Sequence, residues 1–139
     1  MSGVKHVPVI VAAVIFFALG AAWYTALGAQ WLAGIGKTMA DVERDIGGGA
    51  MPYIIGFLAV LVMCYTLAWA IVRFDKRSAG EGAAVGVAMA IGFVAASLAL
   101  NYGFEGRGIA LWAINAGYAA VGLAIAGAII GRYARPATA

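Results

Sequence analysis

Residues 101–118 read NYGFEGRGIALWAINAGY, and this stretch joins two long apolar runs through a short polar turn. The runs on either side, 83–103 and 109–131, contain no Asp, Glu, Lys or Arg. A helix needs roughly 20 residues to cross a hydrocarbon core about 30 Å thick, so each run is long enough to span a membrane. A turn as short as EGRG makes two helices antiparallel neighbours. We therefore expect a transmembrane helical hairpin here.

Two further apolar runs, 7–29 and 52–72, have the same character. The chain of 139 residues is 65% hydrophobic and 11% charged, with a mean hydropathy of +0.97, which is too little charge to cover a soluble domain. We predict an all-α membrane protein: one transmembrane domain over residues 1–139, with four transmembrane helices in an up-down bundle. The first run could instead be a signal peptide, but its length and the aromatic residues that follow favour a span.

The segment between the first two runs has a different pattern. Thr38 and Asp41 form the sequence signature of a capping box, and three consecutive glycines begin at Gly47. Apolar residues recur through this segment at spacings of four, three and four residues, namely at Ile35, Met39, Val42 and Ile46. We predict a short amphipathic helix over residues 38–46, lying near the membrane plane. The alternative is a mobile polar loop.

The basic residues are distributed unequally between the two ends of such a bundle. The end that holds both termini has six of them: Lys5, Arg73, Lys76, Arg77, Arg132 and Arg135. The other end has three: Lys37, Arg44 and Arg107. By the positive-inside rule, both termini are expected in the cytoplasm. The basic residues flank apolar runs instead of forming a stripe, so we expect no nucleic-acid partner.

Charged residues are absent from all four predicted spans. Ion-coupled transporters and intramembrane enzymes usually need an ionisable group at depth, so we expect no enzyme. The only histidine, His6, stands at the edge of the first span, and no His, Cys and carboxylate cluster has metal-ligand spacing. We therefore expect neither a cofactor nor a metal site.

Small residues at four-residue spacing allow helix backbones to approach closely in lipid. Gly82, Gly86 and Ala90 form one such ladder, and Gly127 and Gly131 form another. The ladders could pack inside one chain or form contacts between subunits. A bundle this small leaves most of its surface outward, so we expect a homo-oligomer or other membrane-protein subunits as partners, besides the lipid bilayer.

Uncharged polar side chains could join helices or line a path for a small solute. Ser97 lies nine residues before Gly106 and Asn115 nine after it, so the hairpin register predicts that these two side chains lie level and bond. Asn101 is nearer the turn, where it is expected to bond loop backbone or Arg107.

Around the turn, Glu105 and Arg107 are predicted to pair and to brace the hairpin against Trp23 and Tyr24. The aromatic residues are interpreted as anchors at the membrane interface: Trp23, Tyr24, Trp31 and Trp112. The candidate structural and polar positions are Trp23, Tyr24, Ser97, Asn101, Glu105, Arg107, Asn115 and Tyr118.

Two stretches, FALGAAWYTALGAQWLAGIG at 17–36 and LNYGFEGRGIALWAINAGYAAVGLAIAGAIIG at 100–131, resemble the DUF1761 family of small bacterial integral membrane proteins. The matching positions are Gly20, Trp23, Tyr24, Asn101, Tyr102, Phe104, Glu105, Gly106, Arg107, Ile114, Gly117 and Tyr118. Asn115 stands where the family often has Asp, and Thr25 where it often has Gly. The resemblance implies a four-span helical fold in the bacterial inner (cytoplasmic) membrane, and it assigns no catalytic residue.

Two functional hypotheses follow. The first is a non-enzymatic integral membrane protein that acts as a homo-oligomer or as an accessory subunit of a membrane complex, with the small-residue ladders forming its contacts. The alternative is a small uncoupled channel or facilitator lined by the uncharged polar residues. A pore predicts that these side chains face a shared axis, whereas a structural role predicts that they are paired.

Overall fold

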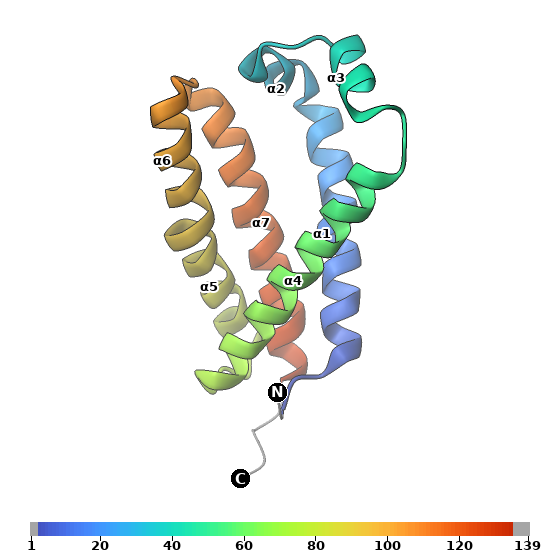
Figure 1. Cartoon of the computed structure of the whole chain (residues 1–139). Helices are drawn as coiled ribbons and strands as arrows, with labels where there is room; N and C mark the ends of the chain where they lie inside the picture. The colour runs from blue at the N-terminus through green and yellow to red at the C-terminus, as the bar shows by residue number, and fades with distance from the viewer. Residues whose placement is uncertain (1–2, 135–139) are drawn as a thin grey trace.

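The structure, a computed structural model, describes residues 3–134, and every regular element in that range is a helix. Four spans are long and apolar enough to cross a membrane (Figure 1). They are α1 (His6–Ala26), α4 (Met51–Arg73), a continuous third span made of α5 (Ala79–Met89), η1 (Ala90–Ala95) and α6 (Ala96–Glu105), and α7 (Ile109–Tyr133). Two short helices, α2 (Gly28–Ile35) and α3 (Met39–Ile46), connect α1 to α4. The all-α, four-span membrane fold class is confirmed.

Two ends of the spans differ from the approximate predicted bounds. The first span ends at Ala26 and not at residue 29, because Leu27 leaves helical geometry before α2 begins. The third span begins at Ala79 and not at residue 83, because Ser78 caps it by accepting a hydrogen bond from the backbone N–H of Glu81. A carboxylate in the first turn of a helix is favoured by the helix dipole, so an acidic residue does not mark the end of a span.

The bundle has two distinct ends. At one, which we call the terminus end, the start of α1 lies beside the end of α7, and Lys5, Val72 and Tyr133 line one small hollow. At the other, which we call the turn end, α2 and α3 lie on the same side as the α6–α7 turn (Figure 1). Arg135, one of the basic residues predicted for the terminus end, lies outside the described residues. Which side of the membrane each end faces stays a prediction.

The two glycine ladders pack against each other within the chain. A Cβ added to Gly82 would lie 2.0 Å from the carbonyl oxygen of Gly127, and one added to Gly86 would lie 2.0 Å from that of Leu123. Gly82, Gly86, Gly127 and Gly131 are all buried. The hypothesis that the ladders form contacts between subunits is therefore wrong, because the glycine-bearing faces of α5 and α7 are buried against each other.

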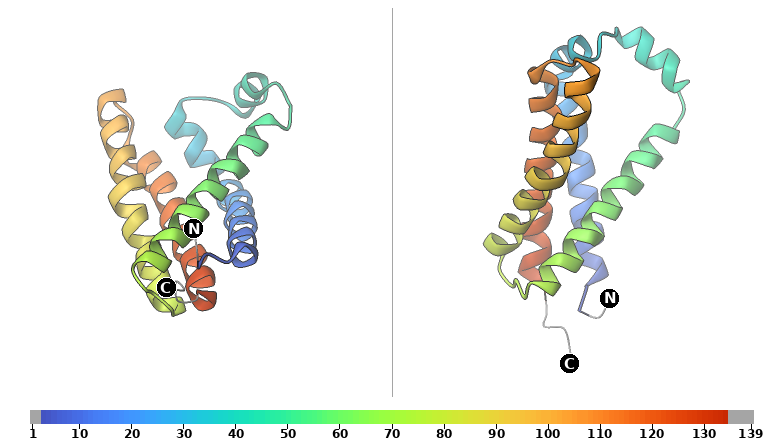
Figure 2. Two further views of the ribbon diagram at one scale, coloured as in Figure 1. Left: turned by 60° about the horizontal axis from the view of Figure 1, so that its bottom comes forward. Right: turned by 60° about the vertical axis from the view of Figure 1, so that its left-hand side comes forward.

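The hydrophobic core lies toward the terminus end. It is formed by the first half of α1, the second half of α4 and the second half of α7, with Phe16, Leu67 and Leu123 among its buried residues. Figure 2 shows that α4 is tilted, so that its beginning diverges from the other spans at the turn end. The side chains at this end of α4, such as Met51 and Ile55, are accordingly exposed.

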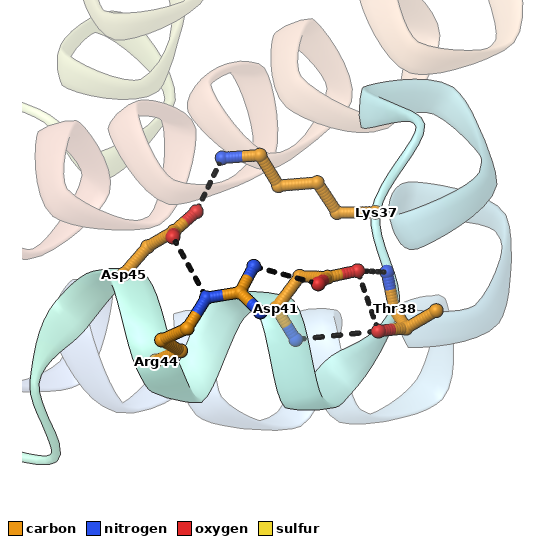
Figure 3. Close-up of polar contacts among 5 residues, drawn as sticks. All are labelled: Lys37, Thr38, Asp41, Arg44 and Asp45. Carbon is orange, nitrogen blue, oxygen red and sulfur yellow. Dashed lines mark hydrogen bonds and ion pairs between the residues drawn. The ribbon is translucent and has the colours of Figure 1, made fainter.

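The short helix predicted over 38–46 is confirmed as α3. Thr38 and Asp41 form the complete capping box, in which each side chain bonds the other residue's backbone N–H (Figure 3). Gly36 and Gly47 bound the helix with φ of +69° and +65°, a conformation that glycine adopts without strain. None of the eight residues of α3 is buried. The loop alternative is thereby excluded, while the placement of α3 in the membrane plane stays a prediction.

Candidate functional site

The first and last spans are joined near the turn end by two hydrogen bonds. The indole Nε1 of Trp23 donates to the carbonyl oxygen of Ile114 at 3.0 Å, and the hydroxyl of Tyr24 donates to Oδ1 of Asn115 at 2.8 Å. A Cβ at Gly117 would approach the Trp23 ring to 3.1 Å, so the glycine makes room for that indole. Trp23 and Tyr24 therefore connect helices within the chain, and their interpretation as interface anchors was incomplete.

Asn115 lies at the centre of a polar cluster that connects three spans. Its Nδ2 donates to the hydroxyl of Tyr102 at 2.8 Å, while its Oδ1 accepts from Tyr24. The ring of Tyr118 lies against that of Tyr24, with centroids 5.3 Å apart, and its hydroxyl donates to the carbonyl oxygen of Phe16 at 3.2 Å. We call Tyr24, Tyr102, Asn115 and Tyr118 the Asn115 cluster. It satisfies polar groups that would otherwise be costly in lipid.

The predicted bond between Asn115 and Ser97 was wrong, as were the predicted partners of Asn101. Ser97 and Asn101 are exposed, and neither side chain makes a hydrogen bond within residues 3–134. Equal distance from Gly106 determines depth but not the side of the helix on which a side chain lies. The long side chain of Tyr102 reaches Asn115 although their positions differ by five residues in depth, or about 7.5 Å at the helical rise.

Across the hairpin, a second bond is made by Trp112. Its Nε1 donates to the carbonyl oxygen of Ala95 at 2.9 Å, at the end of η1, where the helix widens to π geometry. A π turn changes the usual i+4 pairing and exposes carbonyl oxygens to other donors. Trp112 thus serves as a connection within the hairpin and not only as an interface anchor.

Glu105 and Arg107 form the predicted ion pair beside the turn at Gly106. The guanidinium of Arg107 also lies over the ring of Tyr102, with Cζ 5.8 Å from its centroid. In the described part of the chain, neither residue hydrogen-bonds Trp23 or Tyr24. The predicted bracing of the hairpin against those aromatics was therefore wrong. Arg107 instead contacts Tyr102, which is hydrogen-bonded to Asn115, and Asn115 in turn accepts a hydrogen bond from Tyr24.

A cavity of about 530 Å³ opens between α2, α3 and the α6–α7 turn. It is lined by Trp31, Ile35, Lys37, Val42, Asp45, Ile46, Tyr102, Glu105, Arg107 and Asn115. We call it the turn-end cavity. It contains two ion pairs, that of Arg107 with Glu105 and that of Lys37 with Asp45, the latter at 2.7 Å. It therefore presents two positive and two negative side chains beside the amide of Asn115.

The Lys37–Asp45 pair links the α2–α3 connection to the far end of α3 (Figure 3). On the same helix, Arg44 pairs with Asp41 at 2.8 Å. The hydrogen bonds from the side chain and backbone of Thr38, followed by that from Arg44, hold the pKa of the Asp41 carboxyl below its ordinary value. These contacts hold α3 together locally, without burying it.

Next to the turn-end cavity lies an apolar groove of about 500 Å³. It is lined by Phe17, Tyr24, Gly28, Trp31, Leu32, Met39, Pro52 and Tyr53. Trp31 lines both hollows, and its ring meets that of Tyr24 edge-on at 5.9 Å. We call this second hollow, lined by the eight residues above, the apolar groove. Its existence follows from the divergence of α4.

Sequence reasoning missed four residues of this region: Trp31 as a cavity residue, Lys37, Asp45 and Tyr102. Lys37 and Asp45 lie eight residues apart, which along a helix is about 12 Å and too far for the side-chain pairs that three- or four-residue spacing allows. Lys37 precedes the helix, and only its flexible stem brings the charges together. For Tyr102, the polar sequence NYGFEGR around the turn was the feature that could have indicated a place in the site.

The comparisons with known proteins agree with the resemblance found in the sequence. A family model described as DUF1761, protein of unknown function, matches residues 7–131, which is nearly the whole chain. No curated protein and no solved structure matches. The matched region includes all of the Asn115 cluster and all of the residues that line the turn-end cavity. The chain therefore belongs to the DUF1761 family.

Proposed function

We propose that this is a non-enzymatic membrane protein that acts by association, either with a second copy of itself or as an accessory subunit of a membrane complex. The observation that carries the proposal is the outer face of α6. Ser97 and Asn101, one helical turn apart, are both exposed on a span that is the least buried of the four. A polar side chain without a partner is costly in lipid, and a neighbouring helix would supply that partner.

Large apolar side chains flank these two polar residues. Phe93 is 72% exposed and Phe104 is 91% exposed. Together, Phe93, Ser97, Asn101 and Phe104 recur at spacings of three and four residues, so they share one helix face. We call this the α6 face; its first residue, Phe93, lies in η1 just before α6. Aromatic side chains around a few hydrogen-bonding groups suit a helix–helix interface within a membrane.

The channel hypothesis has less support. A pore would expose the uncharged polar residues to a shared axis. Asn115 is instead paired with two tyrosines, and the hydroxyl of Thr25 donates to the carbonyl oxygen of Ala21 on its own helix at 2.6 Å. Of the four polar side chains Thr25, Ser97, Asn101 and Asn115, this leaves Ser97 and Asn101 for the lining, which favours association.

Native mass spectrometry of the full chain released from nanodiscs tests this proposal. We expect the wild-type protein to be an oligomer or to carry a co-purifying subunit, and the double variant Ser97→Ala, Asn101→Leu to lose that association. Thr66→Val is the matched control, because Thr66 is exposed on α4 and bonds only the carbonyl oxygen of Val62. A wild-type protein that is monomeric and free of partners would overturn the proposal.

A further inference from the structure

We propose that the turn-end cavity binds the zwitterionic head group of a membrane phospholipid, one that carries a phosphate ester and a protonated amine, and that the apolar groove takes an acyl chain of the same lipid. This inference is independent of association through the α6 face. Phosphatidylethanolamine is the simplest lipid of this chemistry.

The position of the cavity suits a lipid head group. The cavity lies where the third and fourth spans meet at their turn, and two of its residues, Glu105 and Arg107, flank Gly106. Spans of 21 to 27 residues match the hydrocarbon core, so their ends lie near head-group level. Lipid head groups would therefore lie beside the cavity.

The charges in the cavity favour a zwitterion. Lys37 and Arg107 could hold a phosphate, while Asp45 and Glu105 could hold an ammonium group. An anion alone would leave both carboxylates facing like charge, and a cation alone would do the same to the two basic groups. A head group with one charge of each sign can exchange partners with the ion pairs and leave no charge unmatched.

The Asn115 cluster adds hydrogen-bond donors that its own contacts do not use. The hydroxyl of Tyr102 accepts a bond from Asn115, and within residues 3–134 its own proton has no acceptor. Nδ2 of Asn115 carries two hydrogens, of which the contact with Tyr102 uses one. Both residues line the cavity, and phosphate oxygens accept hydrogen bonds strongly.

An amphiphile also explains why two hollows of different character adjoin. Trp31 lines both, so a single molecule can place its head group on one side of that indole and its chain on the other. The apolar groove is lined by Phe17, Leu32 and Met39, side chains that suit a hydrocarbon tail.

The helix α3 is built to cover such a ligand. Its apolar residues Val42 and Ile46 line the turn-end cavity instead of packing into a core. The apolar side of α3 therefore faces the space that the ligand would occupy.

Lipid titrations of the full chain in detergent, read by native mass spectrometry, test the proposal. We expect phosphatidylethanolamine to be retained about fivefold more tightly than phosphatidylglycerol, a ratio typical of a partly exposed charge contact. Arg107→Gln and Asp45→Asn should each weaken phosphatidylethanolamine binding by about the same factor. The controls are Lys76→Gln and Asp75→Asn, which remove one exposed charge of each sign at the terminus end.

The direction in which Asp45→Asn changes lipid affinity distinguishes a site for zwitterionic lipids from one for anionic lipids. If this variant binds phosphatidylglycerol more tightly than the wild type and loses nothing toward phosphatidylethanolamine, the site is for anionic lipids and the proposal is wrong. Equal losses in the two controls would show non-specific adsorption and would also overturn it. A variant that fails to fold is recognised by its far-ultraviolet circular dichroism, in which case the wild-type preference between the two lipids decides.

The acyl-chain part has a test of its own. Gly28 lines the apolar groove, and a Cβ there meets no atom within 4 Å, so a side chain introduced by Gly28→Leu starts in open space and would occupy part of the groove. We expect it to weaken phosphatidylethanolamine binding about fivefold, since several methylene contacts are lost, and to leave the weak binding of free phosphoethanolamine unchanged. Phosphoethanolamine that binds the wild type as tightly as the lipid does would show that the groove is not used.

Discussion

The two ends of the bundle are closed in different ways. Toward the terminus end, α5 and α7 touch backbone to backbone, and Gly82 and Gly127 leave no space between them. At the turn end, α2 and α3 lie over two hollows, and polar contacts replace close packing. The first arrangement gains dispersion contacts along a whole helix face, which is the main source of helix association in lipid. The second leaves space in which a ligand can bind.

This difference also separates the kinds of residue on which each end depends. The terminus end depends on the absence of side chains, because any Cβ at the α5–α7 contact meets a carbonyl group. The turn end depends on specific donors and acceptors, above all those of Asn115. Substitutions at the first should therefore act on global stability, and those at the second on local structure and binding.

The largest effect is expected for Gly86→Ala. The new Cβ would lie 2.0 Å from the carbonyl oxygen of Leu123, and a backbone atom cannot move aside as a side chain can. We expect a loss of about 2 kcal/mol in the free energy of unfolding, measured by denaturant titration in mild detergent. Gly103→Ala is the control, since its Cβ meets no atom within 4 Å. Equal stability of the two variants would show that α5 and α7 are not in contact there.

Asn115→Leu is expected to cost about 1 kcal/mol, the usual range for interhelical hydrogen bonds in lipid. The substitution removes one partner each from Tyr24 and Tyr102. A double-mutant cycle with Tyr24→Phe should give a coupling energy of similar size. Asn101→Leu, by contrast, should leave the stability of the single chain unchanged because Asn101 is exposed. A coupling near zero would place Asn115 outside the cluster.

A smaller loss, about 0.6 kcal/mol, is expected for Trp112→Phe, which keeps the ring but removes the donor to Ala95. The loss should be local: amide hydrogen exchange should increase in η1 and at the start of α6, while α5 stays protected. Exchange that rises evenly along the whole third span would show that the bond supports the span as a unit.

The smallest effect concerns pH and α3. The pKa of Asp41 is lower in the folded helix than the ordinary value near 3.9, so its capping contacts stabilise α3 above that value. The stabilisation should be lost as the pH falls through the lowered pKa, and the helical chemical shifts of residues 39–46 should decline in nuclear magnetic resonance spectra. In Asp41→Asn this pH dependence should disappear. An unchanged titration in that variant would assign the effect to another carboxylate.

What the sequence by itself determined is local. Span lengths follow from uninterrupted apolar runs, and α3 follows from the capping box of Thr38 and Asp41 together with the glycines after it. Each of these depends on neighbours within a few residues. The turn at Gly106, with φ of +67°, belongs to the same class.

Only the tertiary structure decided which face of each span is buried. In lipid, inward and outward positions are both apolar, so the periodicity that reveals the buried face of a helix in water is nearly absent. Ser97 and Asn115 are equally far from Gly106 in the sequence, yet Ser97 is exposed and Asn115 lies in a cluster, because the rotation of each helix about its own axis is set by packing. Likewise, the ladders that contain Gly82 and Gly127 predicted close helix packing but did not identify the helix that packs against each of them. Which helices pack against each other depends on the fit of their whole surfaces, and no short stretch of sequence determines that fit.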